Sequence, residues 1–291
     1  MNIKNFIALP DSRQLWYAEF GSPDGFPVLY FHGSPASRLE PLLIGDEVLR
    51  NLNLRIIAPD RPGIGRSTFQ PNRGISDWPN DVVALANALK LEKFSIIGNS
   101  GGAPYAAVCA ARIPERIHSV VIVSGGWRMD SPEAKADLPF INRLVFVFAD
   151  KVPFMLGMMF KMMTASGDGE RNQELAQMKQ RMPPADFAAF ENPGRIEALH
   201  RMIREAMRHG TRGAVWDMRL YVREFGFELS EIRIPITLFH GEQDANAPIA
   251  LTRRMAANLP AAQLITYTNE AHLSTLCNHV NEIAQALVQG H

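Results

Sequence analysis

The sequence contains few cysteines, no excess of charge and no long hydrophobic run. Its two cysteines, Cys109 and Cys277, fall in stretches with helical spacing, which favours small buried side chains over a disulfide framework. Lys plus Arg and Asp plus Glu number 30 each, so the zero net charge argues against nucleic acid or an anionic membrane as the main partner. The longest apolar run, residues 152–163, contains a lysine and is too short to cross a membrane.

Signals for targeting, metals and cofactors are also missing. The first residues, MNIKNFIALPDSRQ, have no long apolar core followed by a small-residue cleavage site, so we predict a soluble, cytoplasmic protein without a signal peptide. The histidines do not form an i,i+4 pair with a carboxylate, and there is no Cys/His cluster. We therefore expect no metal, no cofactor and a small-molecule substrate. The sequence leaves open a homodimer.

What the sequence does contain is a regular alternation of apolar strands and helices. Residues 6–9 and 14–20 flank a turn and predict a hairpin. The wholly apolar run 26–32 is typical of a strand that is buried on both faces. The alternation that follows predicts a parallel sheet with helices on both faces. The predicted strands are 54–59, 94–98 and 117–124, and the predicted helices are 39–50, 76–90 and 104–112.

The alternation stops after Trp127 and resumes about a hundred residues later. The intervening segment is rich in methionine and charge, has helical spacing and is interrupted by prolines. We interpret residues 128–227 as a helical cap inserted into a core domain formed by residues 1–127 and 228–291. The resumed pattern predicts strands at 234–241 and 263–268, and helices at 248–258 and 274–289.

The stretch IIGNSGGAPYA places Ser100 between a predicted strand, 94–98, and a predicted helix, 101–112. Gly98 and Gly102 lie two residues before and after it, which is the G-x-S-x-G pattern of a nucleophile elbow. Small neighbours are needed there because the turn is sharp and strained. A glycine-rich turn with a helix-capping serine is an equally good interpretation of this motif alone. Whether Ser100 is a nucleophile or a helix cap therefore depends on whether the chain also supplies a base and an acid for it.

A serine nucleophile needs a histidine base and an acid that orients it, which in this architecture follow in the order Ser, Asp or Glu, His. Asp244 follows one late strand and His272 follows the next, so both are predicted at the carboxyl edge of the sheet. Glu242 and Asp130 are alternative acids. Among the other histidines, His240 is predicted to pack within a strand and His279 to be solvated inside the last helix. His118, His200 and His209 have no strand-end context.

Four segments together carry a family resemblance: HGSP at 32–35, DRPGIGRS at 60–67, GNSGG at 98–102, and GEQD at 241–244 with EAH at 270–272. In this order they resemble the α/β-hydrolase superfamily, in the capped branch that includes serine esterases, proline iminopeptidases and carbon–carbon bond hydrolases. The resemblance implies an α/β fold with a mostly parallel eight-stranded sheet, helices on both faces and an inserted helical cap. It also implies an oxyanion hole formed by the backbone N–H groups of Ser34 and Gly101. His32 resembles a structural histidine.

The resemblance implies a serine hydrolase that cleaves carboxylic esters of small, largely apolar substrates through an acyl-enzyme. Asn99 resembles the Gly-Asn-Ser of carbon–carbon hydrolases. Gly101, however, stands where those relatives usually carry methionine and where iminopeptidases carry tryptophan. Carbon–carbon or amide cleavage by the same triad is one alternative. A ligand-binding or sensor protein on a hydrolase fold is another, because a fold does not fix a function.

Candidate substrate-binding residues are apolar side chains of the cap and the strand end before it, namely Trp127, Met155, Met159 and Phe160. The methionines of the 152–163 run cover nearly every side of a helix, which predicts a buried cap helix packed on the sheet. A flexible lining for an apolar substrate is the second interpretation. The basic segment 200–212 predicts a solvated face, with a carboxylate-bearing substrate as the sharper hypothesis.

Overall fold

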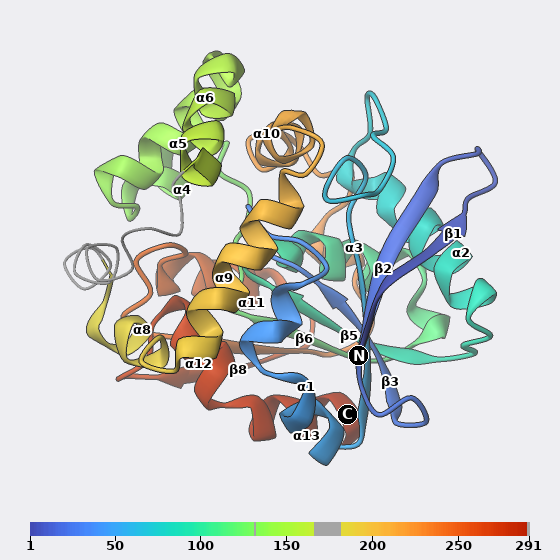
Figure 1. Ribbon diagram of the computed structural model, residues 1–291. Coiled ribbons are helices and arrows are strands. Elements are labelled where there is room, and N and C mark those ends of the chain that lie inside the picture. The colour runs from blue at the N-terminus through green and yellow to red at the C-terminus, as the bar shows by residue number, and fades with distance from the viewer. Residues whose placement is uncertain (131, 166–181, 290–291) are drawn as a thin grey trace.

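A computed structural model describes residues 1–130, 132–165 and 182–289 (Figure 1). Its centre is an eight-stranded sheet in the order β1-β2-β4-β3-β5-β6-β7-β8. β2 runs antiparallel to both of its neighbours, and the pairs from β4 to β8 are parallel. The strands are β1 (Asn2–Ala8), β2 (Gln14–Gly21), β3 (Phe26–Phe31), β4 (Leu54–Pro59), β5 (Phe94–Asn99), β6 (Ile117–Val123), β7 (Ile236–Gly241) and β8 (Ala262–Tyr267).

Helices cover both faces of this sheet, which explains why its central strands are continuously apolar. In β5, Ile96 faces one hydrophobic cluster and Ile97 the other, because successive side chains of a strand point to opposite faces. The first cluster includes residues of α2, α3 and α11, and the second includes residues of α1, α12 and α13. These helices are α1 (Asp46–Asn51), α2 (Trp78–Ala88), α3 (Ala103–Arg112), α11 (Ile249–Asn258), α12 (His272–Asn278) and α13 (Val280–Gln289).

Two predicted helices are each divided in the structure. The predicted helix 39–50 consists of a 3₁₀ turn, η1 (Glu40–Leu43), and α1. Between them, Gly45 has a φ of 101°, which a helix does not permit. The predicted helix 274–289 is α12 followed by α13. His279 therefore lies between two helices, where it stacks on Tyr267 and bonds to Glu282, and its predicted place within one helix was wrong.

A helical insertion separates β6 from β7 (Figure 1). The predicted limits of this cap, 128 and 227, fall between these two strands, and residues 131 and 166–181 of it lie outside the described residues. None of the helices described combines the length and apolar character needed to cross a membrane. The helices of the insertion are α4 (Pro132–Ala136), α5 (Phe140–Lys151), α6 (Pro153–Ala165), α8 (Pro184–Ala189), α9 (Pro193–Ala206) and α10 (Arg212–Leu220).

The methionine-rich run does form a helix, α6, but the prediction that it is buried on the sheet was wrong. Phe154 and Met162 are 76% and 71% exposed. Only part of the helix is covered, as at Leu156 and Phe160, because α6 packs against α5 and α10 and lies at the edge of the insertion (Figure 1). Its remaining apolar side chains therefore face outwards.

Candidate active site

Ser100 occupies a sharp turn at the carboxyl end of β5. It has a φ of 50°, in the left-handed region that side chains rarely adopt, and begins the 3₁₀ turn Ser100–Gly102 before α3. The neighbouring glycines are required by space. A Cβ at Gly102 would lie 2.1 Å from the Phe31 carbonyl oxygen, and one at Gly98 would lie 2.8 Å from the Ala106 Cβ. The α-helix begins at residue 103, between the two predicted starts at residues 101 and 104.

The structure brings Ser100, His272 and Asp244 into one hydrogen-bonded chain. His272 Nε2 lies 2.9 Å from Ser100 Oγ, and His272 Nδ1 lies 2.7 Å from Asp244 Oδ2. The backbone N–H groups of Asn246 and Ala247 donate to Asp244 Oδ1, each at 2.8 Å, and so hold this carboxylate in place. The arrangement is that of a nucleophile, its base and the acid that orients the base.

The other candidate acids and His240 have different partners. Glu242 pairs with Arg253, and Asp130 pairs with Arg128. His240 is buried in β7 as predicted, and its ring nitrogens lie 2.9 Å from Thr252 Oγ1 and 2.7 Å from the Ala247 carbonyl oxygen. Burial lowers the pKa of His240, more than the nearby Asp244 raises it.

Several carboxylates act on His272. Burial by itself lowers the pKa of the imidazole, but Asp244, and then Asp186 and Glu40, raise it, and the net shift is upward. Asp186 was not anticipated from the sequence. Its Oδ1 accepts the N–H groups of Leu273 and Ser274 at 2.8 Å each, at the start of the helix that carries His272. Nothing in the sequence around Asp186, in α8, indicates that its carboxylate will contact α12.

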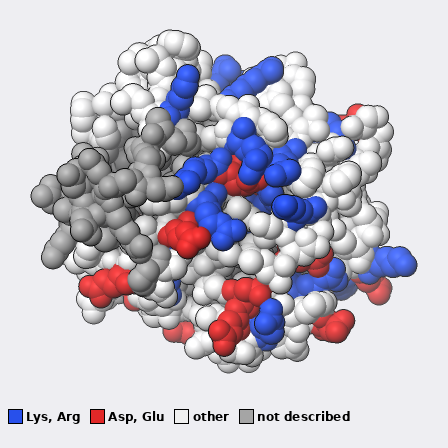
Figure 2. Space-filling model, viewed as in Figure 1, with Lys and Arg blue, Asp and Glu red and all other residues white. Residues whose placement is uncertain are grey.

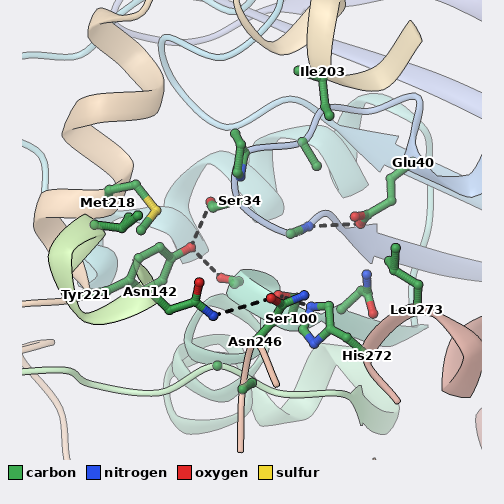
Figure 3. A pocket seen from close by; sticks show the side chains of 18 of the residues that line it. Ser34, Glu40, Ser100, Asn142, Ile203, Met218, Tyr221, Asn246, His272 and Leu273 are labelled. Atoms are coloured by element: carbon green, nitrogen blue, oxygen red, sulfur yellow. Dashed lines mark hydrogen bonds between the residues drawn. The ribbon is translucent and has the colours of Figure 1, made fainter. Parts of the chain in front are cut away.

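Ser34 and Gly101, the predicted oxyanion-hole residues, lie beside Ser100 and are bridged by Tyr221 (Figure 3). The Tyr221 hydroxyl donates to the Gly101 carbonyl at 2.7 Å and lies 3.1 Å from Ser34 Oγ. A Cβ at position 101 would lie 2.5 Å from the same hydroxyl oxygen. Tyr221 therefore fills the space that a side chain after the nucleophile would need, which accounts for Gly101.

Behind Ser34 lies a buried polar network that the sequence did not predict. Asp217 of α10 accepts hydrogen bonds from Arg61, Arg73, Tyr105 and the Ser34 hydroxyl. Arg61 also donates to the carbonyl oxygens of residues 32 and 33. Although burial raises the pKa of Asp217, the two guanidinium groups hold it well below its usual range. The network thus joins the cap to the oxyanion loop.

His32, the first residue of the HGSP segment that contains Ser34, is fully buried. Its Nδ1 lies 2.8 Å from the Gly33 carbonyl oxygen, and burial holds its pKa well below the usual value. These contacts agree with the structural role that the resemblance implies. Arg61, in contrast, stands in the segment DRPGIGRS, to which the sequence assigned no role beyond the family resemblance.

Above Ser100 lies a mostly apolar cavity of about 410 Å³. Three of the four predicted substrate-binding residues, Trp127, Met159 and Phe160, line it. Met155 does not belong to its lining. It lies in the first turn of α6 and is 43% exposed, so the structure does not bring it to the cavity. The lining residues that were not predicted include Glu40, Met129, Asn142, Met202, Met218 and Asn246.

The two cysteines are not joined in a disulfide. Cys109 and Cys277 are buried and unpaired, and burial raises the pKa of the Cys277 thiol to about 11. Among the described residues, no three His, Cys, Asp or Glu side chains are grouped so that they could hold a metal ion.

A family model described as the alpha/beta hydrolase fold matches residues 27–276. The chain belongs to this family. Among curated relatives, this hydrolase is 26% identical to a 2-hydroxymuconate semialdehyde hydrolase of Pseudomonas putida, over 90% of the chain and 84% of the relative. It is 23% identical to a bifunctional esterase/perhydrolase of Acinetobacter calcoaceticus, over 92% of each.

Another relative matches a shorter part of the hydrolase. A non-heme chloroperoxidase of Streptomyces lividans is 36% identical over 40% of this chain, and the match spans 43% of the relative's length. Among solved structures, a thermophilic esterase from Thermogutta terrifontis superposes with a TM-score of 0.66 at 22% identity, covering 97% of this chain and 96% of the other. That likeness shows the shared fold.

Proposed function

We propose that this hydrolase cleaves carboxylic esters of small, largely apolar substrates through an acyl-enzyme. The observation that carries the proposal is the hydrogen-bonded chain from Ser100 through His272 to Asp244 at the base of an apolar cavity. A serine hydroxyl is a weak nucleophile near neutral pH, and an oriented imidazole removes that obstacle.

In the proposed reaction, Ser100 Oγ attacks the ester carbonyl carbon while its proton passes to His272 Nε2. The N–H groups of Ser34 and Gly101 stabilise the resulting oxyanion, and Asp244 stabilises the imidazolium. The tetrahedral intermediate then expels the alcohol, which takes the proton from His272. Water attacks the acyl-enzyme with the same histidine as base, and the carboxylic acid and free Ser100 are released.

Replacement of Ser100 tests the proposal. We expect Ser100→Ala to lower kcat/KM for short p-nitrophenyl esters by at least about 10³-fold, because the covalent step is lost. Circular dichroism and melting temperature check that the fold is retained. Ser22→Ala, in a turn remote from the cavity, is the matched control. A fluorophosphonate should label the wild-type protein at Ser100, shown by peptide mapping, and equal turnover by both variants would refute the proposal.

Carbon–carbon bond cleavage is the second candidate, because Asn99 lines the cavity and the Pseudomonas putida relative matches over most of its length. A vinylogous diketone, an aminoacyl arylamide and an ester, assayed side by side, separate carbon–carbon, amide and ester cleavage. A diketone rate that exceeds the ester rate would replace the first candidate by the second.

A further inference from the structure

Glu40 places a carboxyl group inside the cavity that contains Ser100. It is the first residue of η1, its side chain is 2% exposed, and its Oε2 accepts the Gly33 N–H at 2.9 Å. Figure 3 shows Glu40 on the same side of the site as Ile203 and Leu273, with Tyr221 on the opposite side. One side of the cavity therefore presents a carboxylate among aliphatic side chains.

Among the described residues, the basic group that lines the cavity together with Glu40 is His272, which must be neutral to act as the base. The described lining includes no lysine or arginine, and no ion pair between described residues involves Glu40. Burial raises the pKa of Glu40, whereas the Gly33 N–H and the charge of Arg61 lower it. Arg61 itself lies behind Ser34. There it donates to Asp217 and to loop carbonyls. Two further carboxyl groups, those of Asp244 and Asp186, act on His272 together with Glu40.

The basic residues of α9 do not reach the cavity. Its lining takes only apolar residues from this helix, namely Leu199, Met202 and Ile203. Arg201 of α9 and Arg208, which follows that helix, are exposed and pair with Glu197 and Glu205. Figure 2 shows Lys and Arg gathered on the outer surface of this face. The hypothesis that segment 200–212 binds a substrate carboxylate thus finds no support.

We propose that Glu40 makes this site selective for uncharged substrates by repelling esters that carry a carboxylate. The inference rests on the proposed ester hydrolysis for its substrate class. Two like charges in a poorly hydrated cavity repel strongly, and each also loses hydration on burial. An apolar, neutral substrate is neither repelled by Glu40 nor deprived of the hydration of a charge.

Two pairs of esters of matched length test the selectivity. p-Nitrophenyl pentanoate and p-nitrophenyl hydrogen glutarate differ by a carboxylate on the acyl part. Phenyl acetate and 4-acetoxybenzoate differ by one on the alcohol part. We expect the wild-type protein to prefer the uncharged member. Glu40→Gln should reduce this preference by about tenfold in at least one pair, since a glutamine oxygen still accepts the Gly33 N–H but carries no charge. The pair that responds identifies which part of the substrate faces Glu40.

A purely structural role for Glu40 would change both members of a pair equally, and that result would overturn the proposal. Glu242→Gln is the control, because Glu242 is paired with Arg253 and does not line the cavity. Binding of hexanamide and hexanoate, measured by calorimetry, does not depend on turnover. If no ester is hydrolysed, the proposed function fails. An unchanged ratio of the two dissociation constants in Glu40→Gln then separately overturns the role of Glu40.

Discussion

At the scale of single residues, the environment of each side chain decides what it can do. The ring of His272 joins a serine on one nitrogen and a buried carboxylate on the other. His240 Nε2 also lies 3.4 Å from Asp244 Oδ2, but the ring of His240 bonds to Thr252 and a backbone carbonyl and does not reach the serine. Both histidines lie near Asp244, but only His272 also contacts Ser100, so His272 is the candidate base and His240 is a packing residue.

The raised pKa of His272 predicts the pH dependence of the reaction. The base works only when neutral, and nearby carboxylates favour its charged form, so kcat/KM should fall on acidification with a midpoint above the ordinary value of 6.5. Asp186→Asn removes one of these negative charges and should shift the midpoint to lower pH. Asp137→Asn, on the surface, should leave it unchanged. A midpoint that does not move in Asp186→Asn would contradict this electrostatic account.

Tyr221 is expected to act as a positioning residue for the oxyanion hole. Tyr221→Phe removes the hydroxyl that joins the Gly101 carbonyl and Ser34 Oγ, which leaves a buried carbonyl without this donor. We expect kcat to fall by about tenfold, the effect of roughly one net hydrogen bond, with KM little changed. Tyr267→Phe is the control, since its hydroxyl bonds to Glu282 on the surface. Equal kcat values in wild-type and Tyr221→Phe would exclude the role.

At the scale of elements, α10 connects the cap to the catalytic loops. Asp217 of α10 and Tyr221, which caps its C-terminus, lie four residues apart and therefore on one side of the helix, where they contact the Ser34 loop and the Gly101 turn. Two arginines converge on Asp217 from the loop after β4 and from the segment before α2. The position of α10 and the shape of the oxyanion loop are thus coupled.

Asp217→Asn should destabilise the protein strongly. Arg61 and Arg73 are buried, and without the carboxylate their charges lack a counterion, a change that typically costs about 3–5 kcal/mol. Urea unfolding at neutral pH measures the loss. Asp137→Asn removes a partly exposed pair with Arg254 and should cost about 0.5 kcal/mol or less. Similar losses in both variants would show that Asp217 is not essential to this network.

At the scale of the whole molecule, apolar side chains of the described residues gather on the two faces of the sheet, around the cavity and on the outer side of the cap. Those on the sheet are buried, whereas α6 presents Phe154, Met158 and Met162 to the surface. Polarizable methionines suit both a cavity lining and an adaptable surface. Whether a methionine is buried or exposed depends on where its helix lies in the fold.

Oxidation of methionine should report this distribution. Dilute hydrogen peroxide should convert Met158 and Met162 to sulfoxides well before Met129 and Met218, because the first two are exposed and the others are buried. Peptide mass spectrometry over a time course measures the four rates. The urea-unfolded protein, in which the rates should converge, is the control. Equal rates in the folded protein would contradict the placement of α6.

The sequence by itself determined the alternation of strands and helices, the turn at Ser100 and the order of Ser100, Asp244 and His272. These features depend on local spacing and on the rule that the carboxyl ends of parallel strands meet at one edge. It also predicted the helical insertion, because the change in composition is visible along the chain. The order of the motifs thus indicated the family and the chemistry together.

Only the tertiary structure decided which distant residues surround that serine. The hydrogen bond from Tyr221 to Gly101 spans 120 positions, and the bond from Ser34 to Asp217 spans 183. Periodicity also did not indicate that α6 faces outwards or that Glu40 enters the cavity. Such contacts arise when separate elements pack, and their energy depends on distance and burial in space, which neighbouring residues in the chain do not specify.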